Sequence, residues 1–179
     1  MNKHVMLLAK STVLGILSAI STTVAAETIS LSITMDKSWE ILDANIQNQQ
    51  TSGNQINYQL KLDEQVMFEA NKKNTNSVFA ISIISKEDAE GATSAKDYLI
   101  KNKLPSPDTP HKTDNQSIGG VQFDNISTAI NYDPAVKTLE QNYAALKNTY
   151  ILEIYTACEE GHSSCQELNS LIKTIKFND

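Results

Sequence analysis

The stretches Tyr150-Ile-Leu-Glu-Ile-Tyr-Thr-Ala-Cys158 and Cys165-Gln-Glu-Leu-Asn-Ser-Leu-Ile-Lys-Thr-Ile175 stand near the end of this 179-residue chain and differ in their hydrophobic period. The first alternates bulky residues as a β-strand requires. The second repeats apolar residues at the spacing of one helical face: Leu168, Leu171, Ile172 and Ile175. Together they predict a strand that leads through a short loop into a helix.

Two cysteines bracket the loop between this strand and this helix. Ser164 stands three residues before Glu167, a spacing that predicts a capping box with Cys165 as the first helical residue. An exported chain with two cysteines is expected to oxidise them, so we predict a disulfide between Cys158 and Cys165. Closing so short a loop stabilises a fold by roughly 2–3 kcal/mol.

The same loop offers two chemical alternatives. Cys158, His162 and Cys165, together with Glu159 or Glu160, have a plausible spacing for a metal site. The run Gly161-His-Ser-Ser-Cys165 imitates the first four positions of the G-x-S-x-G elbow of hydrolases. Its fifth position is a cysteine, and no histidine follows it to complete a triad in that order. These alternatives would make the protein a hydrolase or a metal-dependent enzyme that uses His162.

The N-terminus has the pattern of an export signal. Lys3 and His4 precede an apolar region from Val5 to Ile20, and Val24-Ala-Ala26 supplies small residues for cleavage. Lys10 interrupts the apolar region, so we expect no stable membrane span. We therefore predict a signal peptide over residues 1–26 and one domain over residues 27–179, released into the periplasm or secreted.

The composition argues against several classes of partner. The formal net charge is −6, and every basic residue other than histidine is a lysine. Such a chain is a poor partner for nucleic acid or an anionic membrane surface. No cofactor is expected, since the sequence lacks a phosphate-binding glycine loop, and the acidic run from Glu87 to Glu90 lacks the spacing of a calcium loop.

The middle of the chain predicts a sheet with one short helix. Strands are expected over residues 28–34, 66–70 and 78–84, the last apolar on both faces and therefore central. Ser94 and Asp97 predict the cap of a helix that ends before Pro105. Ile118-Gly-Gly-Val121 predicts a hairpin tip, and the Asn- and Gln-rich residues 45–57 predict a loop.

Two stretches are compatible with either helix or strand. Residues 54–63 alternate like a strand but are rich in Gln and Lys. In residues 134–147, Asp133-Pro134 is a good helix start, and local spacing slightly favours a helix. The class predicted is α+β, with a central antiparallel sheet flanked by helices and a C-terminal helix tied to the last strand by the disulfide.

The order of these elements, with a tryptophan after the first strand and a final helix over Leu168 to Phe177, resembles the PsbP/DcrB-like fold. The resemblance implies an antiparallel sheet between helices, and a strand over residues 137–146. It implies no catalytic residues, and relatives of that fold are mostly exported or accessory proteins that bind proteins or small ligands. The chain lacks the lipoprotein cysteine of the DcrB pattern.

These patterns favour an exported, non-enzymatic binding or accessory protein whose partner is an unknown protein or small ligand. One alternative is an inhibitor or immunity protein directed against a toxin or hydrolase, for which small acidic exported domains are suited. The other is the enzyme that uses His162.

Export is open to a direct test. N-terminal sequencing of the protein from the cell envelope or the medium is expected to begin at Ala26 or Glu27, because cleavage follows the small residues there. Recovery of a cytoplasmic protein that still begins at Met1 would contradict both the localisation and the oxidised state of the cysteines.

Overall fold

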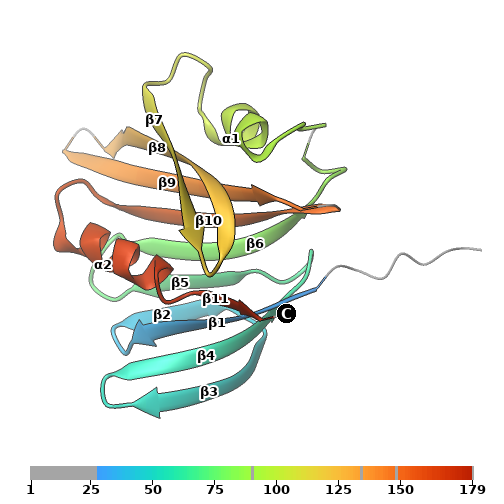
Figure 1. The fold of residues 1–179 in the computed structure, drawn as a ribbon. Coiled ribbons are helices and arrows are strands. Elements are labelled where there is room, and N and C mark those ends of the chain that lie inside the picture. The colour runs from blue at the N-terminus through green and yellow to red at the C-terminus, as the bar shows by residue number, and fades with distance from the viewer. Residues whose placement is uncertain (1–27, 90, 134, 148, 179) are drawn as a thin grey trace, which may run out of the picture.

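The computed structural model describes residues 28–89, 91–133, 135–147 and 149–178, which form two antiparallel sheets and two helices (Figure 1). Strands hold 58% of these residues and helices 13%. The fold is therefore mostly β, and the predicted α+β class with a sheet flanked by helices is wrong. The predicted signal peptide lies outside the described residues.

The larger sheet has seven strands, with β10 at its centre. In order across the sheet they are β2 (Trp39–Asp43), β5 (Phe68–Lys72), β6 (Val78–Ser85), β10 (Tyr150–Glu159), β9 (Val136–Leu146), β8 (Val121–Asp133) and β7 (His111–Ile118). Every neighbouring pair is antiparallel.

The smaller sheet has four strands and brings the two ends of the described chain together. Its order is β11 (Lys176–Asn178), β1 (Ile29–Asp36), β4 (Gln55–Leu62) and β3 (Ile46–Ser52). The first strand of the fold is thus paired with the last, and Leu31 lies opposite Phe177.

The two helices occupy different places. Helix α1 (Ala95–Lys103) lies over one face of the larger sheet against β8 and β9, and helix α2 (Ser163–Ile172) packs against β10 and β1 (Figure 1). Neither is long and apolar enough to cross a bilayer, and the rest of the described chain contains no such helix.

Strand β10 separates two environments because its side chains alternate between the faces of the sheet. Leu152, Ile154 and Cys158 belong to the main core, which also contains residues of the smaller sheet and of α2. On the opposite face, Ile151 belongs to a second, smaller core beneath α1. The main core is built around fully buried large side chains from both sheets, among them Phe68, Phe79, Phe123, Leu31 and Ile33.

Several local predictions are confirmed. Strands cover 29–36, 68–72 and 78–85, and the last of these is an interior strand of the larger sheet. Ser94 caps α1, where its hydroxyl accepts a hydrogen bond from the Asp97 amide at 3.0 Å. The hairpin tip forms at Gly119 and Gly120, which both have positive φ angles.

The predicted loop over residues 45–57 is wrong, because most of it pairs as the hairpin of β3 and β4. Gly53, at φ +59°, allows the tight turn, and all of β3 is exposed at the sheet edge. Within residues 54–63, which the sequence left open, Gln55–Leu62 is the strand β4. A polar edge strand carries no hydrophobic alternation, so its sequence resembles that of a loop.

The local preference for a helix over residues 134–147 is also wrong. Residues Val136–Leu146 of this stretch form β9, which pairs with β10 on one side and with β8 on the other. Ladders on both sides, together with the buried Tyr143, Ala144 and Ala145, outweigh a helix start at Asp133-Pro134. Tertiary pairing therefore overrides the local pattern.

Candidate functional site

The predicted disulfide between Cys158 and Cys165 is present, with the two Cα atoms 5.5 Å apart. It joins β10 to α2. The chain continues beyond α2 into β11, so the helix is not tied to the last strand as predicted. Both sulfur atoms are held in the S–S bond and are not thiolate ligands in this form. Among the described residues, no group of three or more His, Cys, Asp or Glu side chains is placed to hold a metal ion.

His162, the residue on which both enzymatic alternatives depend, caps helix α2. Its Nδ1 atom accepts a hydrogen bond from the Ser164 backbone amide at 3.2 Å and lies 2.8 Å from the Ser164 hydroxyl. The helix begins at Ser163, and Ser164 is buried within its first turn. The predicted cap at Ser164 is therefore wrong. Histidine is an unusual cap, so the sequence signal pointed to the serine instead.

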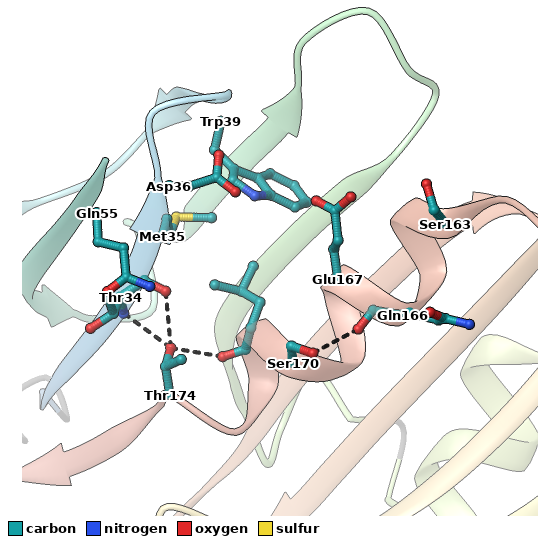
Figure 2. A pocket seen from close by; sticks show the side chains of 11 residues that line it. Thr34, Met35, Asp36, Trp39, Gln55, Ser163, Gln166, Glu167, Ser170 and Thr174 are labelled. Atoms are coloured by element: carbon teal, nitrogen blue, oxygen red, sulfur yellow. Dashed lines mark hydrogen bonds between the residues drawn. The ribbon is translucent and has the colours of Figure 1, made fainter. Parts of the chain in front are cut away.

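Figure 2 shows one hollow of the surface, a cleft of about 390 Å³ between α2 and the end of β1. We call it the Trp39 cleft. The carboxylates of Asp36 and Glu167 lie beside the indole of Trp39. Glu167 is paired with Lys72, whose ammonium group lies 5.9 Å from the Trp39 ring.

Several polar groups of the Trp39 cleft have partners within the fold. Burial alone would raise the pKa of Asp36, but hydrogen bonds from the Ser38 side chain and backbone hold it below its ordinary value. The Thr174 hydroxyl accepts from the Thr34 amide at 3.0 Å and joins α2's end to β1. Trp39 itself is part of the main core. This cleft is best described as a packing interface.

A second hollow of the surface contains buried carboxylates. It has a volume of about 510 Å³ and lies on the α1 face of the larger sheet, beyond the C-terminal end of α1. We call it the Glu140 cavity. Its lining includes Lys103, Tyr132, Glu140, Asn142, Glu153 and Tyr155. Glu140 and Glu153 are only 7% and 4% exposed, so this cavity contains two buried carboxylates.

Glu153 is fully compensated. Its Oε1 atom lies 2.6 Å from the ammonium group of Lys103, and its Oε2 accepts a hydrogen bond from the Tyr98 hydroxyl at 2.7 Å. Burial, and then the neighbouring charge of Glu153, raise the pKa of Tyr98 well above its ordinary value. Both donors come from α1, so this carboxylate fixes the helix to the sheet.

Glu140 is held differently, by two tyrosines. The hydroxyls of Tyr132 and Tyr155 donate to its Oε1 atom at 2.5 and 3.1 Å. The hydrogen bond to Glu140, and then burial, raise the pKa of Tyr132 to about 12. Burial, and then the Glu140 charge, raise the pKa of Tyr155. Both tyrosines are therefore held neutral, as hydrogen-bond donors.

The charge of Glu140 has no partner within the described parts of the chain. No lysine there forms an ion pair with it, and no hydrogen bond reaches its Oε2 atom. Its strand neighbour Thr128 is buried with its hydroxyl also unpaired among these residues. The cavity floor thus presents an uncompensated carboxylate oxygen.

Sequence reasoning missed both glutamates. Glu153 was visible as a carboxylate inside an apolar strand, between Leu152 and Ile154, which is a recognisable signal of a buried charge. Glu140 lies in the stretch predicted as a helix, where it would be an ordinary surface residue. Only the pairing of β9 with β10 places it beside Tyr155.

Comparison with known proteins identifies no relative that would indicate a function for this cavity. No protein-family model matches the chain, and no curated protein is significantly similar to it. The resemblance to the PsbP/DcrB-like fold therefore stays a prediction.

The capping role of His162 can be measured by urea unfolding. His162→Ala is expected to lower the free energy of unfolding by about 1 kcal/mol, because α2 loses its cap. His162→Asn, which keeps an acceptor that suits this position, is the matched control and is expected to recover most of the loss. Equal stability of all three proteins would contradict the capping role.

Proposed function

We propose that this chain is an exported, non-enzymatic binding protein that acts in the periplasm or outside the cell, and that the Glu140 cavity is its ligand site. The observation that carries the proposal is the buried Glu140 carboxylate on the cavity floor, which has no ion-pair partner and no donor to its Oε2 atom among the described residues. The disulfide and the predicted signal peptide support the compartment, since disulfides persist in oxidising environments.

An uncompensated buried charge is costly for a fold. Removing a carboxylate from water costs several kcal/mol unless a counter-charge or a full set of hydrogen bonds replaces the lost hydration. The fold supplies both to Glu153 and neither in full to Glu140.

The cavity also has the size of a small-ligand site. Its volume of about 510 Å³ falls within the usual range for such sites. Most of its lining side chains are polar, among them two tyrosines, two asparagines and four carboxylates, and the half-buried Ala80 and Ile84 of β6 add apolar surface. Placed polar groups orient a small molecule, and the apolar side chains beside them offer it contact area.

Binding is favoured over catalysis by what the reactive groups do. Cys158 and Cys165 form the disulfide, and the Nδ1 atom of His162 caps α2. These are the residues that the metal and hydrolase alternatives require. The disulfide withdraws both sulfur atoms from metal binding, and the helix cap uses one of the two ring nitrogens of His162.

Fragment screening by NMR tests the proposal. Small cationic, neutral and anionic compounds are added to the ¹⁵N-labelled, disulfide-bonded protein, and amide shifts are mapped. We expect the binders to shift amides around Tyr132, Glu140 and Tyr155, because the cavity holds the uncompensated group. Binders that instead shift only the Trp39 cleft, or no binders at all, would contradict the assignment.

A further inference from the structure

The charges around the Glu140 cavity define the sign of a ligand. Asp63 and Glu64 line it together with the two buried glutamates, and Lys103 is the one lysine among the described lining residues. The ammonium group of Lys103 is already paired with Glu153. The cavity is therefore negative overall, and an anionic ligand would be repelled from it.

The free oxygen defines the kind of group that binds. Oε1 of Glu140 already accepts hydrogen bonds from two hydroxyls, whereas Oε2 has no donor among the described residues. A single N–H donor satisfies that oxygen. A guanidinium binds a carboxylate best through two parallel hydrogen bonds, which would need both oxygens. An ammonium group acts as a point charge with several donors and needs only one.

Other cations fit less well. A calcium ion takes six to eight oxygen ligands, and the described residues bring no group of three acidic or histidine side chains together. A quaternary ammonium has no N–H to donate to Oε2. Its attraction to the site would come only from cation–π contacts with the rings of Tyr132 and Tyr155.

The rim of the cavity suits an apolar chain attached to the charged group. Met67 and Tyr132 both line it, and they are 42% and 71% exposed. Large apolar side chains open to water at the mouth of a site offer contact area to a ligand's carbon chain.

On these grounds we propose that the Glu140 cavity binds a small molecule carrying a primary ammonium group on a short carbon chain, with Oε2 of Glu140 accepting the N–H hydrogen bond. This inference rests on the proposed function and names its ligand class. Tyr132 and Tyr155 position the carboxylate, because their hydroxyls hold Oε1 and leave Oε2 as the acceptor.

The test is an NMR titration of the oxidised protein with n-butylammonium chloride. Matched probes are n-butanol, n-butyrate, n-butylguanidinium, tetramethylammonium and calcium chloride. We expect n-butylammonium to bind most tightly and to shift amides around Glu140, Tyr132 and Tyr155. Glu140→Gln is expected to weaken it about thirtyfold or more, since a buried charged partner is lost. Glu40→Gln removes the same charge from an exposed residue outside the cavity and is expected to change nothing.

The outcomes separate the two proposals. If n-butanol or n-butyrate shifts the cavity amides and n-butylammonium does not, the ligand class is overturned while the cavity remains a binding site. Tighter binding of n-butylguanidinium or calcium would also overturn it. If Glu140→Gln does not fold, as its own NMR spectrum will show, the order of the probes on the natural protein still decides. If n-butylammonium shifts no cavity amide, the inference fails, and the wider fragment screen then judges the site.

Discussion

The apolar face of β10 is the constraint on which the rest of the structure depends. Leu152 and Ile154 are sealed into the core between the larger sheet, the smaller sheet and α2. Because strand side chains alternate, fixing these residues inward forces Glu153 and Tyr155 to the opposite face. A one-residue slip would bury the carboxylate in the main core, so the register is strongly specified. The disulfide reinforces it by holding the end of β10 to α2.

The opposite face is covered only in part, and this creates the cavity. Helix α1 has nine residues and shields Ile126, Ala144 and Ile151. Its last turn brings Lys103 onto Glu153, so the neutralised carboxylate sits under the helix end. One strand further across, Glu140 forms no ion pair with that lysine and accepts hydrogen bonds from tyrosines of β8 and β10. The length of one helix thus distinguishes the carboxylate that fixes the helix from the one proposed to bind a ligand.

Elements with local signals could be predicted from the sequence, and those that depend on pairing could not. Ser94, the Gly119-Gly120 tip and the alternation of 150–158 carry their structure in adjacent residues. Strand β3 has no apolar face to reveal it, and β9 gains its conformation from neighbours distant in sequence. The candidate site has the same origin. Glu140 receives its partners from two other strands, so nothing beside it in the chain marks it as functional.

The central claim is that two similarly buried glutamates have opposite roles, and the free energy of unfolding tests it most directly. Glu153→Gln should lower that free energy by about 1–3 kcal/mol, because it breaks the pairing with Lys103 and weakens the hydrogen bond from Tyr98. Glu140→Gln should raise it, because the amide still accepts from both tyrosines and no longer buries an uncompensated charge. Urea unfolding of both variants at neutral pH gives the comparison. A loss of stability in Glu140→Gln equal to that in Glu153→Gln would show that both carboxylates are structural and contradict the account.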